Sequence, residues 1–183
     1  MSSRIHAFAV LSLCASVSVT SVLGSEAISH RLTGGVEIDT AMADVDTGTG
    51  VYLAYEIDLP EPISLMLDCS YIRGDFNVPS GAGTYTSLGI GAYLILKHKV
   101  GEWTPYVGCG GADHFNHFDN VKYDNKLSMV WLAGSRLNLG ERLGLDASLR
   151  YRMLRVNADD TTVKPNPLDM DSLVIRVGLV YEL

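Results

Sequence analysis

Hydrophobic and polar residues alternate along most of this chain with a period of two. In residues 142–153, every second position is apolar or aromatic, and the positions between them carry arginine, aspartate, serine or glycine. Successive side chains of a β-strand point to opposite faces of its sheet, so this period predicts a strand with one apolar and one polar face.

The same alternation recurs in eight segments, which cover residues 32–40, 50–58, 64–73, 84–97, 103–110, 127–138, 142–153 and 173–183. Each has about the length, roughly ten residues, that a tilted strand needs to cross a bilayer. Beyond the N-terminal segment no part of the sequence has a convincing helical period. We therefore expect an all-β fold.

The predicted connections alternate between long and short. The long ones are residues 41–48, 74–83, 114–125 and 157–170, and the short ones are residues 58–63, 98–102 and 138–141. Up-and-down barrels of the outer membrane have this asymmetry, with short turns in the periplasm and long loops outside. The sequence thus predicts an eight-stranded antiparallel up-and-down transmembrane β-barrel with both chain ends in the periplasm.

The N-terminal segment has a different character. Arg4 precedes an apolar stretch, and small residues follow it. This order is typical of a secretory signal peptide, so we expect a signal at residues 1–24, cleaved between 24 and 27, and a barrel domain at residues 28–183. The alternative is an N-terminal helix that stays attached. Export permits disulfides, but Cys69 and Cys109 lie among apolar residues of two segments that are not neighbours in sequence, and we expect free thiols that are buried or face lipid.

If the eight strands close into a barrel in lipid, the apolar face meets acyl chains and the polar face points inward. The interior of an eight-stranded barrel is just wide enough for side chains to fill it. Buried charges are tolerated when they are paired, which predicts a filled lumen with a charge network. Its expected members are Glu37, Asp39, Glu56, Asp68, Arg136, Asp146, Arg150, Arg152 and Arg176. Closure would bring Arg176 to Glu37 or Asp39.

Aromatic residues on the apolar face lie mostly toward the ends of the predicted strands. Bilayer interfaces favour amphipathic rings at this level, so we expect an aromatic girdle. Its candidate members are Tyr55, Tyr71, Trp103, Trp131, Tyr151 and Tyr181. The alternative is that these are ordinary core aromatics.

The stretch WTPYVGCGG at residues 103–111 and the final strand LVIRVGLVYEL resemble small outer-membrane β-barrels of the opacity type and the membrane domain of outer membrane protein A. In that family an aromatic-Thr-Pro-Tyr sequence followed by alternate glycines opens a central strand. The matching residues are Trp103, Thr104, Pro105, Tyr106, Gly108 and Gly110. The family's last strand usually ends in phenylalanine, whereas this chain ends in Leu183 with Tyr181 two places before.

The resemblance implies a non-enzymatic barrel in the Gram-negative outer membrane, without a cofactor, that has a structural role or contacts other molecules through four long loops. The implied partners are outer-membrane lipid and lipopolysaccharide, the assembly machinery, and a host or extracellular ligand at the loops. We expect a monomer. A formal net charge of −7 argues against a nucleic-acid partner.

Residues 113–120 contain the candidate chemistry of the chain. Imidazole and carboxylate groups occur together here, in His114, His117, Asp113 and Asp119, and both are suitable metal ligands. Their spacing by itself is only a weak indication of a metal site, so we expect a solvated loop without metal. Lipid A deacylases are also eight-stranded barrels and carry a His-x-Ser-Asn motif. His117 and Asn120 fit it, but Asp119 replaces the nucleophilic serine.

A soluble exported barrel of lipocalin type remains as a further alternative. Such a barrel turns its apolar face inward around an apolar ligand and its charges outward. Alternation alone does not distinguish the two orientations.

Overall fold

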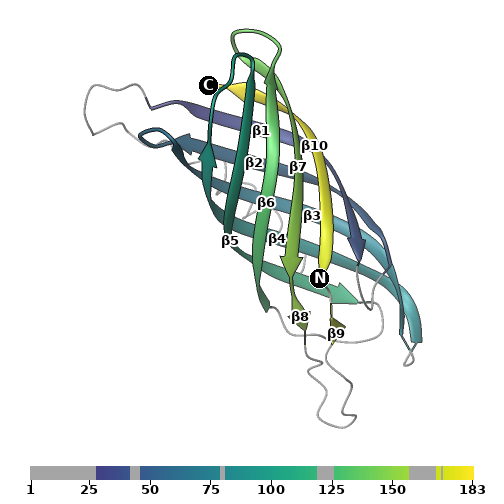
Figure 1. Ribbon diagram of the computed structural model, residues 1–183. Coiled ribbons are helices and arrows are strands. Elements are labelled where there is room, and N and C mark those ends of the chain that lie inside the picture. The colour runs from purple at the N-terminus through teal and green to yellow at the C-terminus, as the bar shows by residue number, and fades with distance from the viewer. Residues whose placement is uncertain (1–27, 42–45, 79–80, 119–125, 157–167, 170) are drawn as a thin grey trace, which may run out of the picture.

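The computed structural model describes residues 28–41, 46–78, 81–118, 126–156, 168–169 and 171–183. The predicted signal peptide lies outside these residues. Eight antiparallel strands close into one barrel in the order β1-β10-β7-β6-β5-β4-β3-β2 (Figure 1). They are β1 (His30–Ala41), β2 (Gly48–Asp58), β3 (Ile63–Val78), β4 (Gly81–Lys97), β5 (Trp103–Phe118), β6 (Lys126–Asn138), β7 (Leu143–Met153) and β10 (Ser172–Glu182).

The predicted fold is therefore confirmed, because each of the eight alternating segments forms a barrel strand. The last strand pairs with the first, and Glu37 lies opposite Arg176 in that pairing. Every wall strand has two neighbours, so no wall strand leaves an edge of unpaired backbone groups that could pair with another chain. Among the described residues no helix is long and apolar enough to span a bilayer.

The two ends of the barrel differ. We call the end with residues 59–62, 98–102 and 139–142, which link β2–β3, β4–β5 and β6–β7, the short-turn end. The C-terminus lies at this end as well (Figure 1). The opposite end is the loop end, where a small pair of strands, β8 (Arg155–Val156) and β9 (Leu168–Asp169), follows β7.

Two predicted long loops are partly wrong. Residues 74–83 are mostly strand, since β3 runs to Val78, β4 begins at Gly81, and pairing continues to the tip of the hairpin. Residues His114–Phe118 belong to β5. The glycines and the proline of residues 74–83 are typical of a turn, but at least one of these glycines has a packing reason. A Cβ on Gly74 would lie 2.6 Å from the ring of Tyr85, so glycine gives that ring its space.

Candidate functional site

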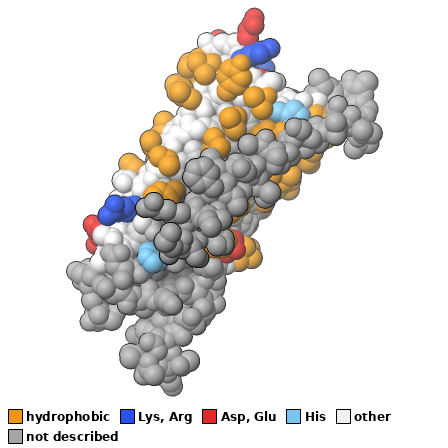
Figure 2. Space-filling model, turned by 180° about the vertical axis from the view of Figure 1, so that it is seen from behind, with side chains coloured by type: hydrophobic (Ala, Val, Ile, Leu, Met, Phe, Trp, Pro, Cys, Tyr) orange, Lys and Arg blue, Asp and Glu red, His pale blue; other side chains and the backbone are white. Residues whose placement is uncertain are grey.

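Large apolar side chains cover the outside of the barrel. Val36, Val51 and Leu127 are 60%, 57% and 77% exposed, and similar residues follow on every wall strand. Figure 2 shows these side chains along the visible wall, with the charged side chains mainly toward its ends. Soluble monomers rarely expose a contiguous apolar surface of this kind, and in lipid it is buried at a gain of roughly 25 cal/mol per Å².

Charged side chains point into the lumen and are almost fully buried. The alternation of each strand places them there, and every expected member of the charge network is 6% exposed or less: Glu37, Asp39, Glu56, Asp68, Arg136, Asp146, Arg150, Arg152 and Arg176. This orientation, with charges inside and apolar residues outside, is the reverse of a lipocalin-type barrel. The soluble binding-barrel alternative is therefore wrong.

A central cluster of four charged residues lies midway along the lumen: Glu37, Asp68, Arg150 and Arg176. Arg176 donates to Glu37 through Nε and to Asp68 through Nη1, each at 2.5 Å. Arg150 donates to the same Asp68 oxygen, also at 2.5 Å. Five different strands supply these four residues and Tyr93, whose hydroxyl donates to Asp68 at 3.2 Å. The cluster thus ties the barrel wall together across its axis.

Three lumen arginines each lie over a tyrosine ring. Arg176 lies 4.5 Å from the ring centroid of Tyr52, and Arg150 lies 4.9 Å from that of Tyr93. The third pair is Arg136 and Tyr106, at 5.3 Å. Cation–π attraction is strongest where water is excluded, as it is here.

Inward-facing glycines make room for these rings. A Cβ on Gly178 would lie 2.5 Å from the Tyr52 hydroxyl, and one on Gly91 would lie 2.1 Å from the Tyr93 hydroxyl. Gly134 stands in the same relation to Tyr106, at 2.5 Å. The alternating glycines of the sequence therefore face large inward side chains on other strands or farther along the same strand.

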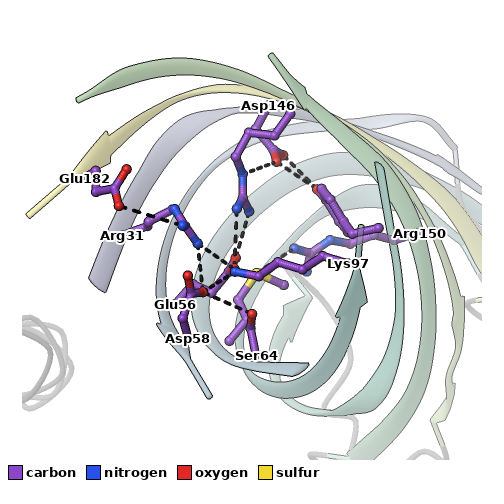
Figure 3. A network of polar contacts seen from close by, with 11 residues as sticks. Arg31, Glu56, Asp58, Ser64, Lys97, Asp146, Arg150 and Glu182 are labelled. Atoms are coloured by element: carbon purple, nitrogen blue, oxygen red, sulfur yellow. Dashed lines mark hydrogen bonds and ion pairs between the residues drawn. The ribbon is translucent and has the colours of Figure 1, made fainter. Parts of the chain in front are cut away.

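A second group, the mouth cluster, lies at the short-turn end: Arg31, Glu56, Asp58, Lys97 and Arg136. Figure 3 labels the first four of these residues. Arg136 donates to Glu56 at 2.7 Å and 3.3 Å, and Arg31 donates to Asp58 at 2.7 Å. Lys97 pairs with both carboxylates. The side chains of Arg31 and Asp58 are each 18% exposed. Two polar cavities of about 170 and 240 Å³ adjoin the cluster and share Arg31 and Arg136.

Toward the loop end, large apolar and aromatic side chains are buried beside one further ion pair. Ile72, Tyr85 and Leu154 are 2%, 1% and 1% exposed, and we call them the loop-end group. Next to this level, Arg152 donates to Asp39 at 2.5 Å. The cavity in the middle of the lumen measures only about 20 Å³, close to the volume that holds one water molecule.

His114 is not in a solvated loop, which corrects that expectation. It lies inside the barrel, 3% exposed, and its Nε2 and the Ser128 hydroxyl are 3.0 Å apart. The Ser128 hydroxyl donates to the Ala112 carbonyl, so its oxygen accepts from His114. The other ring nitrogen lies 3.4 Å from the Ser87 hydroxyl. The imidazole therefore has polar partners on both sides.

His117 lies on the opposite, outward face of β5 and is exposed. The two histidines therefore do not converge on one ion, and the described residues contain no group of three or more His, Cys, Asp or Glu that would hold a metal. For the deacylase hypothesis, Asp119 and Asn120 lie outside the described residues. His117 itself faces outward, away from the serines of the lumen.

The six girdle candidates all point outward. Trp103 begins β5 and Tyr181 is near the end of β10, whereas Trp131 lies halfway along β6. Tyr55 donates to or accepts from His30 Nδ1 at 2.8 Å, beside the short-turn end. Tyr71 and Tyr151 lie toward the loop half of their strands. Cys109 is a free thiol exposed on the outer wall, as predicted, and Cys69 is half-buried on the same wall.

Sequence reasoning missed Arg31 and Lys97. Both share the inward parity of their strands. Arg31 lies one residue before the predicted segment 32–40, and Lys97 is the last residue of the predicted segment 84–97, so following the alternation to the short-turn end of each strand would have found them. Sequence reasoning also did not predict which arginine lies over which tyrosine ring. That pairing depends on the register between strands, and the spacing within one strand does not contain it.

No protein-family model matches this sequence, and no curated protein matches it. Solved structures do. OprG, an outer membrane protein of Pseudomonas aeruginosa, has a TM-score of 0.72 and 15% identity over 89% of this chain and 99% of that one. Neisserial surface protein A has a TM-score of 0.64 and 15% identity over 88% and 100%. Ail, the attachment invasion locus protein of Yersinia pestis, has a TM-score of 0.59 and 16% identity over 85% and 99%.

The chain thus has the fold of the small eight-stranded outer-membrane β-barrels, as the sequence resemblance implied. The apolar outer wall of the described strands suits this fold to a lipid bilayer.

Proposed function

We propose that this chain is a non-catalytic integral outer-membrane barrel whose lumen is a fixed, charge-compensated plug. In this proposal the barrel wall holds the loop end at the cell surface, and the loops there make the contacts that matter for function. The short-turn end and both chain ends face the periplasm. Residues 1–24 serve as the signal for export, and residues 28–183 form the barrel domain.

The observation that carries the proposal is the filling of the lumen. The central cluster bridges the axis with bonds of 2.5 Å, and the space left beside it is about 20 Å³. A hydrated ion needs a wider path than one water molecule occupies. The loop-end group adds large buried side chains beside the Arg152–Asp39 pair, which opposes a continuous column of water.

The proposed role of the loops is supported by the scarcity of accessible polar surface on the middle of the described barrel wall. The described wall offers lipid an apolar surface, and the enclosed lumen offers a partner little access. Two of the similar structures are named as a surface protein and an attachment invasion locus protein. We therefore propose that the partners are outer-membrane lipid and lipopolysaccharide around the wall, the assembly machinery during insertion, and an extracellular ligand at the loops. The proposed state is a monomer, and nucleic acid is not a partner.

Conductance of the purified protein in planar bilayers tests the plug. We expect no steady single-channel currents from the folded barrel in concentrated salt. Folding is verified in the same sample by a shift in gel mobility on boiling. A steady open conductance from heat-modifiable protein would contradict the plug, and recovery of the native chain in the soluble periplasmic fraction would contradict the membrane location.

A further inference from the structure

A row of polar side chains crosses the outer face of four neighbouring strands at the loop end. Thr49 on β2 lies opposite Arg73 on β3, Arg73 lies opposite Thr86 on β4, and Thr86 lies opposite His117 on β5. Thr49, Arg73 and His117 are exposed, and Thr86 is half-buried. We call these four residues the donor row, because each offers a hydroxyl, guanidinium or imidazole hydrogen.

An apolar row lies two residues closer to the middle of the barrel on the same four strands. It consists of Val51, Tyr71, Leu88 and Phe115, which are opposite one another in the same pairings. Val51, Tyr71 and Phe115 are 57%, 48% and 42% exposed. With strands about 4.8 Å apart, each row spans roughly 14 Å. The two rows together form an amphipathic ledge where the apolar wall ends.

The ledge lies on one side of the barrel. At the loop end of β7, β10 and β1, the outward residues are Met153, Leu173 and Thr40, and the described part of these strands presents no outward arginine, lysine or histidine there. Among the side chains that the structure describes, an anionic lipid head would therefore find a cation at β3 and a further ring donor at β5.

We propose that the ledge binds a phosphorylated glycolipid of the outer leaflet, of the lipid A type. This inference rests on the proposed placement of the loop end at the cell surface. The phosphate accepts hydrogen bonds from Arg73, whose planar guanidinium suits a phosphate oxygen pair, and from the hydroxyls beside it. The acyl chains lie on the apolar row, with the Tyr71 ring at the boundary between chain and head group.

Two carboxylates on the same outer face limit where the phosphate lies. Asp75 is two residues beyond Arg73, is exposed, and points outward like it. Asp113 precedes Phe115 by two residues and is half-buried between Ile90 and Leu127. Both repel a phosphate, so the head group lies along the donor row between them. Removing Asp75 should therefore strengthen binding while removing Arg73 weakens it.

The test uses native mass spectrometry of the folded, detergent-solubilised protein with diphosphoryl lipid A and with the same lipid after removal of both phosphates. We expect the wild type to bind the phosphorylated form about tenfold more tightly, the effect of one charge-assisted hydrogen bond. Arg73→Gln should abolish this preference. Asp75→Asn should increase it about threefold through relief of like-charge repulsion.

Arg142→Gln is the matched control, since Arg142 is an exposed arginine at the short-turn end. It should bind both lipids like the wild type. The proposal is overturned if Arg73→Gln keeps the preference for the phosphorylated lipid, or if Arg142→Gln loses that preference to the same degree. It is also overturned if millimolar inorganic phosphate displaces the lipid completely, because the acyl chains would then contribute nothing to binding. The shift in gel mobility on boiling verifies that each variant is folded. A negative result would therefore contradict the lipid site only, and the membrane location and the plugged lumen are tested separately by fractionation and conductance.

Discussion

The two ends of the lumen handle charge in different ways. At the short-turn end, the mouth cluster places arginine, lysine and carboxylate beside polar cavities, and its outer members Arg31 and Asp58 keep 18% of their side-chain surface exposed. Deeper in, the central cluster is closed off, with Glu37 and Arg176 only 1% and 4% exposed. Toward the loop end, the pair of Arg152 and Asp39 is equally closed off, at 3% and 1% exposed, beside the side chains of the loop-end group.

The difference teaches how much an ion pair depends on its surroundings. An exposed pair gains little, because water and salt screen both partners. A buried pair is weak evidence for stability as a whole, but removing one partner leaves a charge without water or counter-charge. The same arginine-carboxylate chemistry should therefore respond to mutation very differently at the centre and at the mouth.

Arg176→Met should have the largest effect. It removes the direct partner of Glu37 and one of two cations beside Asp68, so the free energy of unfolding should fall by about 3–5 kcal/mol. Urea titration of the barrel in lipid vesicles, followed by tryptophan fluorescence, measures the change. The double variant Arg176→Met with Glu37→Leu should recover part of the loss, because it removes the orphaned carboxylate. A double variant that loses the sum of both single effects would contradict the coupling.

Tyr85→Ala should come next. Its loss leaves a hole at the loop end and should lower the free energy of unfolding by about 3 kcal/mol. It should also produce brief openings in planar-bilayer recordings, if the ring helps to exclude water from that end. Tyr71→Ala is the control, since Tyr71 is on the neighbouring strand but points outward and is 48% exposed. Equal currents from both variants would argue against a seal at Tyr85.

Arg31→Met at the mouth should have the smallest effect. Asp58 and Glu56 keep Lys97 and Arg136 as partners, and the site is partly open to water. We expect a loss of at most about 1 kcal/mol in the same urea titration. The loss should shrink further in high salt, whereas that of Arg176→Met should not. A loss as large as that of Arg176→Met would remove the distinction between the mouth and the centre of the lumen.

Much of this architecture follows from the period of the sequence. Once Leu145, Leu149 and Tyr151 are assigned to one face, Asp146 and Arg150 must lie on the other, and closure of eight strands places them in a lumen. The partners across the axis do not follow. Arg150 meets Asp68 because strand register and tilt bring β7 opposite β3, and neither is written in the period of one strand.

The ends of the strands were also harder to predict than their middles. Gly74 and Gly81 break the alternation and resemble turn residues, but the backbone ladder of β3 and β4 continues through them. His114 read as part of a loop because polar residues surround it, although its parity with Tyr106 already placed it on the inward face of β5.

Quenching of the two tryptophans by brominated lipids tests the central claim, that the apolar face looks outward to acyl chains, most directly. Trp103 and Trp131 are the only tryptophans in the chain, and they are 54% and 52% exposed on the outer wall. With Trp103→Phe, we expect Trp131 to be quenched most by bromine deep in the acyl chains. With Trp131→Phe, Trp103 should be quenched most by bromine near the head group. Fluorescence that ignores bromolipids but is quenched by aqueous iodide would contradict the account.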